Sequence, residues 1–336
     1  MKYFTHPEGK FIIKIPVEWQ YKNVAVGYDE KPPFSFELYE DNIGCFQLSC
    51  YSEKEKAINK TVKSQKFDTD NLDFLEQRMD GGGFNMHLWF AVVEDHMFMA
   101  KYIYDTDKAE NKKVKTELRK AKESLKSLRL LSLNARKEAI ITDRYEKFMA
   151  SLAASFDLLN AAYENKSAIE IIIVIANQID AYLRLAIIMK KQLKNKNDEI
   201  DISLLYQGEN DKAIFEKRIY KIAKDLGILD LTLFNRLETL YNKRNKTVHR
   251  YIISDLRTRD IDDLSIEYVF ISEEIRLINE KLENEQFEEK IGIYGGLRNP
   301  QEEHSPESIN FLHSQVNDKH LTGKWERKIK TPNKKQ

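Results

Sequence analysis

The chain has 336 residues, which exceeds the usual size of one domain, so two domains are expected. Basic and acidic residues number 54 each, and this balance excludes a global electrostatic attraction to nucleic acid or to a membrane surface. The first residues lack the apolar core of a secretion signal, and no apolar run reaches the roughly 18 residues of a membrane span. These features predict a cytoplasmic protein without a membrane partner.

Residues 10–104 carry short alternating or aromatic runs that favour strands, among them FIIKIP, FSFELY, CFQLSCY, MHLWFAVV and HMFMAKYIY. The glycines at 81–83 indicate a turn, and the segment at 71–79 before them allows a short helix. Residues 112–131 then switch to a helical period. Cys45 and Cys50 are predicted to lie on opposite faces of one strand, so neither a disulfide between them nor a thiolate metal site is expected.

The order of these elements is an apolar strand, a proline and a tryptophan, a meander of strands and a closing helix that ends SLKSLRLL. That order resembles the Mog1/PsbP-like α/β sandwich over roughly the first 130 residues. The resemblance implies that residues 1–132 form an α+β domain, an antiparallel sheet with helices, and serve as a sensing or docking module.

Residues 143–288 are predicted to be an all-α bundle, because strand signals give way to helical periodicity. Helices are expected at 145–165, 168–193, 211–228, 229–248 and 272–288. In the second of these, the stripe that faces the core is predicted to comprise Ile169, Ile172, Ile173, Ala176, Leu183 and Ile187. Residues 291–336 are polar and lack a sustained apolar period, which predicts a flexible tail or a docking segment.

The fourth helix ends in YNKRNKTVHR, where Arg244 is followed by Asn245 and, five positions after the arginine, by His249. Such spacing is a weak signal by itself, since Arg298 and His304 form a similar pair across a proline near the tail. The first pair lies where two bundle helices meet, so the fold could hold its geometry. In that context residues 143–288 resemble the HEPN family, whose signature is an arginine, a polar residue and a histidine near the end of such a bundle.

The resemblance implies a metal-independent endoribonuclease of toxin or antiviral systems that needs neither cofactor nor metal. It also implies a homodimer through the helical bundle, with Arg244 and His249 of both chains lining one cleft that binds RNA. Cleavage by the 2′-hydroxyl needs a proton acceptor, a proton donor and a cation near the phosphorane, and histidine and arginine suit these roles. Asn245 would orient its neighbours or contact phosphate.

Other side chains can serve the same site, and each has a plainer interpretation. Asp180 interrupts the apolar stripe of the second helix, so it orients Arg244 or His249, forms a structural ion pair, or reaches solvent at the edge of the stripe. Lys243, Lys246 and Arg250 would attract RNA, or they are solvated surface. His249 itself could instead be a structural histidine at a helix end.

Two other functions fit the same sequence. The bundle could dimerise as a non-catalytic HEPN-like interaction or scaffold protein, in which the arginine and histidine merely hold a helix junction. The chain could also be a regulatory subunit of a larger defence complex, binding a protein partner through its N-terminal domain or its basic tail.

Overall fold

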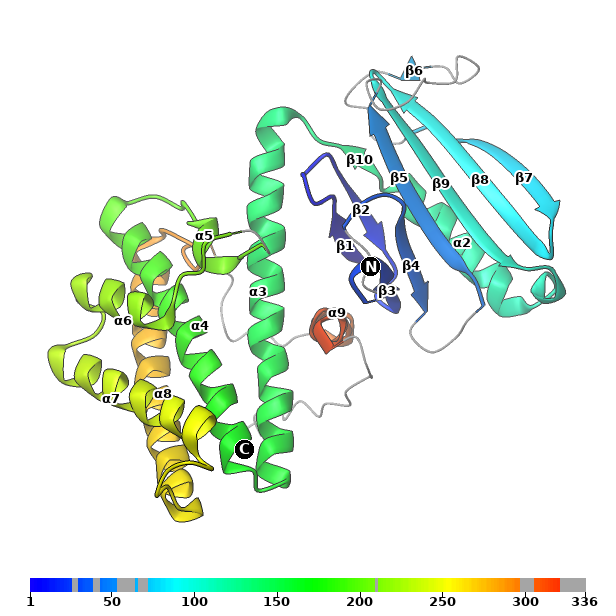
Figure 1. Cartoon of the computed structure of the whole chain (residues 1–336). Coiled ribbons are helices and arrows are strands. Elements are labelled where there is room, and N and C mark those ends of the chain that lie inside the picture. The colour runs from blue at the N-terminus through cyan, green and yellow to red at the C-terminus, as the bar shows by residue number, and fades with distance from the viewer. Residues whose placement is uncertain are drawn as a thin grey trace, which may run out of the picture. The chain divides into compact units, whose positions relative to one another are not determined.

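The computed structural model describes residues 1–25, 30–38, 43–52, 64–65, 72–208, 211–296 and 305–320. The chain divides into two compact units (Figure 1). We call residues 1–143 together with 304–336 the sheet unit, and residues 144–303 the helical unit. The sequence predicted a break between 132 and 143 and a separate tail, whereas the structure assigns the residues from 304 onward to the sheet unit.

The sheet unit contains two sheets. The strands are β1 (Lys2–Thr5), β2 (Phe11–Ile15), β3 (Trp19–Tyr21), β4 (Phe34–Leu38), β5 (Cys45–Ser52), β6 (Ser64–Gln65), β7 (Leu75–Gly81), β8 (Phe84–Val93), β9 (His96–Asp105) and β10 (Arg129–Leu130). The helices are α1 (Lys22–Ala25), α2 (Lys112–Lys126) and α9 (Pro306–His320), with a short 3-10 turn at Thr106–Lys108. The larger sheet has the order β3-β4-β5-β9-β8-β6 with β7 also paired to β8, and the smaller has the order β1-β2-β10.

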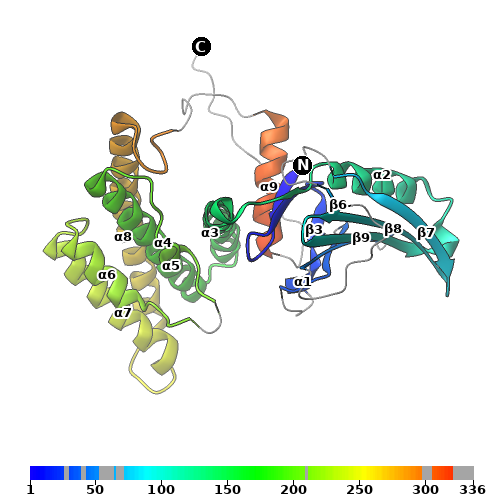
Figure 2. The ribbon, with the colours of Figure 1, turned by 90° about the horizontal axis from the view of Figure 1, so that it is seen from above.

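One face of the larger sheet is covered by α2 and by the smaller sheet, as Figures 1 and 2 show from two sides. The core between them is rich in aromatic rings, with Phe11, Phe34 and Phe98 fully buried. Trp19 also lies in this core, where its indole N–H donates to the buried Glu117 carboxylate of α2 at 2.6 Å. Strand alternation places these side chains on one face, so α2 has a continuous apolar surface to cover.

The described part of the predicted helical segment, residues 72–79, does not form a helix. The structure has β7 over Leu75–Gly81, paired antiparallel with β8 through a turn at Gly82 and Gly83, which have φ of +65° and +86°. Leucine, glutamate, glutamine, arginine and methionine all favour helices locally, but the glycine turn and the neighbouring strand override that preference.

The predicted flexible tail contains a helix. α9 spans Pro306–His320, and it meets the first strand through Lys2, whose ammonium donates to Asp318 at 2.5 Å and to Ser314 at 3.0 Å. The sequence analysis allowed a flexible tail or a docking segment, and for these residues the structure has a helix in contact with the first strand. Tertiary contacts fix this helix, whose own apolar period is weak.

The helical unit consists of α3 (Leu133–Glu164, which begins in the sheet unit), α4 (Ala168–Asn195), α5 (Ile202–Leu205), α6 (Glu216–Asp225), α7 (Leu231–Arg250) and α8 (Thr258–Glu289). The predicted helices exist, but their starts differ: α3 begins at Leu133 and α8 at Thr258, each more than three turns before the expected 145 and 272, and α6 begins at Glu216 instead of 211. At the start of α8, the Asp260 side chain accepts a hydrogen bond from the Arg257 backbone at 2.8 Å, so the cap is an arginine rather than a usual capping residue.

α4 is the central helix and packs against α8, α6, α7 and α5. Its buried face is shifted from the predicted stripe, since Ile169 and Ile173 are exposed while Ile175 and Ile179 are buried. α4 is also the one helix of the described residues that is long and apolar enough to cross a membrane, yet 61% of its most apolar window is buried inside the protein. That burial is typical of the core helix of a soluble protein.

An antiparallel-sheet unit and a helical unit together confirm the predicted mixed α+β class at this level. The resemblances of the two units to the Mog1/PsbP sandwich and to the HEPN bundle stay predictions.

Candidate functional site

Arg244 lies on the face of α7 that meets α6, and its guanidinium is held by a carboxylate. Nη1 of Arg244 donates to Oε2 of Glu216, the first residue of α6, at 2.7 Å. The two side chains are only 17% and 16% exposed. Partial burial makes this charge-assisted pair stronger than a surface ion pair.

The other side of the guanidinium faces Asn245. The side-chain oxygen of Asn245 accepts from Nε of Arg244 at 3.3 Å and from Nη2 at 3.0 Å. The ring of Tyr241 lies one helical turn earlier, 4.8 Å from Cζ of Arg244. Asn245 therefore orients the arginine, which is one of the two roles expected for it.

Two tyrosines line the same ion pair. The hydroxyl of Tyr220 donates to Glu216, and the buried hydroxyl of Tyr268 has no hydrogen-bond partner among the residues that the structure describes. Burial raises the pKa of both tyrosines, so they are neutral donors at ordinary pH. Burial also opposes the charge on Arg244, but the hydrogen bond and the attraction of Glu216 keep the pKa of Arg244 above its ordinary value.

His249 lies on the last turn of α7 and is exposed. It makes no hydrogen bond or ion pair with the part of the chain that the structure describes. Five residues along one helix correspond to a rotation of about 140° and a rise of about 7.5 Å, so His249 and Arg244 point in different directions. Within one chain the structure does not bring the two side chains together.

Asp180 forms an ion pair with a neighbour on its own helix. Its Oδ2 accepts from Nε of Arg184 at 2.6 Å, and Arg184 also donates to the carbonyls of Leu204 and Ile214 at 3.2 and 3.1 Å. Oδ1 of Asp180 is buried without a partner. Burial raises the pKa of Asp180, and the charge of Arg184 opposes that rise. The contacts match the structural ion pair rather than a hydrogen bond that orients the arginine or histidine of the signature.

The basic residues differ in their availability to a ligand. Lys243 is paired with Glu267 of α8 at 2.9 Å, whereas Lys246 and Arg250 are exposed. The second arginine and histidine pair, Arg298 and His304, lies outside the described residues.

The end of α7 exposes apolar side chains beside His249. Val248 and Tyr251 are partly exposed, and Ile252 and Ile253 in the following turn are 94% and 81% exposed. Two adjacent isoleucines with this exposure are unusual on a monomer, because apolar surface of this kind is normally covered.

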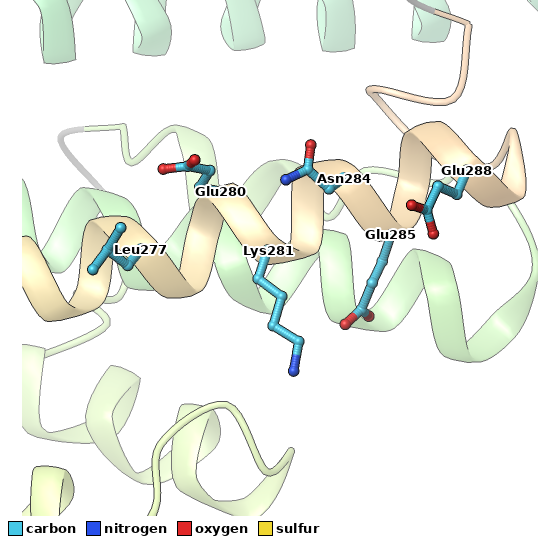
Figure 3. A pocket seen from close by; sticks show the side chains of 6 residues that line it. All are labelled: Leu277, Glu280, Lys281, Asn284, Glu285 and Glu288. Carbon is cyan, nitrogen blue, oxygen red and sulfur yellow. The ribbon is translucent and has the colours of Figure 1, made fainter.

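A shallow hollow runs along α8, away from the signature. It is lined by Leu277, Glu280, Lys281, Asn284, Glu285 and Glu288 (Figure 3). Three carboxylates against one amine give it a negative potential, which would repel RNA phosphates. The candidate residues of α7 do not contribute to it.

No protein-family model matches the chain, and no curated protein matches it. Among solved structures, a crystal structure of a protein from Bacteroides thetaiotaomicron VPI-5482 covers 54% of this chain and 76% of its own. It shares 13% identical residues at a TM-score of 0.27, a likeness too weak to carry an argument on fold or function.

Glu216 and Tyr220 are the site residues that the sequence analysis missed. Their spacing of four residues on one helix suits a Glu–Tyr hydrogen bond, and this pattern could have drawn attention to α6. The partnership of Glu216 with Arg244 is tertiary, however, and no local pattern reports it.

Proposed function

We propose that the helical unit is a metal-independent endoribonuclease of the HEPN type, completed by a second copy of the chain and acting in toxin-type or antiviral defence. The observation that carries the proposal is the placement of the Arg–Asn–His signature on the last two turns of one bundle helix. There Asn245 orients a fixed arginine, and the histidine is exposed beside an apolar surface.

The number of proton-transfer roles is the reason why the proposed mechanism needs a second copy. A proton acceptor for the 2′-hydroxyl and a proton donor for the leaving 5′-oxygen are two groups, and each chain offers one exposed signature histidine. Facing copies supply both. The 2′-oxygen attacks phosphorus as one His249 takes its proton, and the bond from phosphorus to O5′ breaks as the other His249 donates a proton.

Arg244 would stabilise the charge of the phosphorane. Glu216 and Asn245 occupy part of its guanidinium fork, which leaves the remaining N–H groups for phosphate oxygens. Lys246 and Arg250 are exposed near the same helix end and would attract the RNA backbone, whereas the ion pair of Lys243 makes its contribution smaller.

The test compares wild type with His249→Ala on total RNA in the presence of EDTA. We expect wild type to leave 2′,3′-cyclic phosphate and 5′-hydroxyl ends, and the variant to lose roughly 10²- to 10⁴-fold in cleavage rate, the usual contribution of a general acid or base. Arg298→Ala removes the arginine of the second pair and should cleave like wild type. Equal cleavage by wild type and His249→Ala would contradict the mechanism.

One observation favours a second candidate, a non-catalytic interaction protein. Arg244 is engaged by Glu216 and faces away from His249, as a purely structural arginine would be. In that case the purified protein binds RNA or a protein partner without cutting RNA, and RNA binding weakens steeply with added salt.

A further inference from the structure

β7 is an edge strand with an open side. Among the described strands it pairs with β8 alone, and all of its residues are exposed. In an antiparallel ladder every second residue directs its N–H and C=O away from its neighbour, so β7 presents a row of unpaired backbone groups. Proteins usually block such an edge with proline, lysine or a bulge, and LEQRMDG contains neither of those residues.

The two faces of β7 differ in chemistry. On one face Leu75 and Met79 are 55% and 48% exposed, and they stand opposite Phe90 and Met86 of β8, with Gln77 between them. On the other face Glu76 contacts His87 at 3.0 Å and Lys122 at 2.9 Å, and Arg78 follows it.

We propose that β7 pairs antiparallel with β7 of a second copy, with Gln77 on the two-fold axis. This register sets Leu75 against Met79 of the second copy and Glu76 against its Arg78. Each apolar pair extends the cross-strand rows that Phe90 and Met86 already form, and each charged pair joins opposite charges.

Other symmetric registers centred on a charged residue set like charges against each other. A two-fold axis at Arg78 sets arginine against arginine, and an axis at Glu76 sets glutamate against glutamate. In a register whose axis falls between two residues, each residue would stand opposite one that belongs to the other face of β7. Apolar positions would then oppose charged ones. An axis at Met79 also joins opposite charges, Arg78 against Asp80, but it makes one apolar pair where the axis at Gln77 makes two. The register centred on Gln77 is therefore favoured.

The first test is disulfide trapping in the full chain. Opposed residues have Cβ atoms about 4.5 to 5.5 Å apart, close enough for a disulfide after a small adjustment. Gln77→Cys should form a covalent dimer under mild oxidation. Leu75→Cys and Met79→Cys should each stay uncoupled, but a mixture of the two should couple. Wild type controls for Cys45 and Cys50, which are half-buried and buried.

The second test is sedimentation of wild type and Arg78→Glu. The variant turns two attractive cross-strand pairs into two repulsive ones, which should raise the dimer dissociation constant roughly tenfold. Failure of Gln77→Cys to couple, or equal coupling by Met79→Cys alone, would overturn the proposal. A dimer that Gln77→Cys does not trap belongs to another surface, so this outcome leaves the proposed ribonuclease dimer untouched.

Discussion

Arg244 has a carboxylate on one side and an amide on the other, and this asymmetry sets what the residue can do. Glu216 neutralises part of its charge, while Asn245 fixes its orientation without adding a charge. A bound phosphate would have to compete with Glu216 for the same guanidinium. The ion pair thus stabilises the free protein, and in the proposed ribonuclease it would weaken the hold of the arginine on a phosphate.

Removal of the Glu216 charge should therefore destabilise the helical unit. Because the pair is only partly buried, we expect Glu216→Gln to cost about 1 to 3 kcal/mol of unfolding free energy, less than a fully buried pair. Urea unfolding followed by far-ultraviolet circular dichroism measures this. Glu267→Gln is the matched control, since Glu267 pairs with Lys243 of the same helix but both are exposed. An equal loss in both variants would contradict the role of burial.

Glu76 should link the stability of the sheet unit to pH. Burial opposes its charge, but hydrogen bonds from Lys122 and His87 outweigh that effect and lower the pKa of Glu76 to about 2. A lowered pKa gives stability that is present above the ordinary carboxyl pKa and is lost as pH falls toward 2. The difference in unfolding midpoint between wild type and Glu76→Gln should thus shrink from pH 6 to pH 3. A difference that is independent of pH would contradict this linkage.

Among single residues, the sequence drew attention to Arg244 and Asn245, which contact each other in the structure, but not to the carboxylate that pairs with the arginine. Asn245 follows Arg244 directly, so a local pattern could suggest that it orients the arginine. Glu216 lies 28 residues earlier on another helix, and only tertiary packing brings it to Arg244. The pairing of Asp180 with Arg184 is local, at four residues' spacing, and the structural interpretation of Asp180 follows from it.

Among the elements, α9 offers the clearest stability test. Burial lowers the pKa of Lys2, and Asp318 opposes that effect by its charge and hydrogen bond. Asp318→Ala would leave a buried ammonium without this carboxylate, which should cost about 1 to 3 kcal/mol.

The double variant Lys2→Met with Asp318→Ala should recover most of that loss, because the charge that needs a partner is gone. Thermal unfolding of the two single variants and the double variant measures the coupling. Lys319→Ala, an exposed neighbour on α9, should unfold like wild type. Additive losses would show that the two residues do not interact.

The sequence predicts a helix or strand well where one hydrophobic period persists along it. It predicts poorly where contacts with neighbouring elements determine the structure. α4 and α7 carry long apolar periods, the side chain of Asp230 caps the start of α7, and Gly227, at φ of +69°, follows the end of α6. β7 and α9 have weak or misleading local signals, and neighbouring elements determine their structure. The stripe of α4 was misplaced at Ile169 and Ile173 because isoleucine occurs on every side of that helix's first turns.

For the whole molecule, we expect the two units to differ in their ability to fold as separate fragments. The apolar core of the helical unit lies entirely within residues 144–303. A fragment of these residues should therefore unfold cooperatively, as judged by circular dichroism in urea. Residues 1–143 alone lack the partner of Lys2 and should have a lower midpoint than the sheet unit in the full chain. A fragment 144–303 without a cooperative transition would contradict this division.

The contact between Lys2 and Asp318 joins residues that are 316 positions apart. During synthesis, the first strands leave the ribosome long before α9 exists, and the helical unit can fold in the meantime because its core is complete earlier. The sheet unit reaches its final form only after the last helix emerges. A protein truncated before Pro306 would thus keep every residue of the bundle core but would lack the helix that contacts its own first strand.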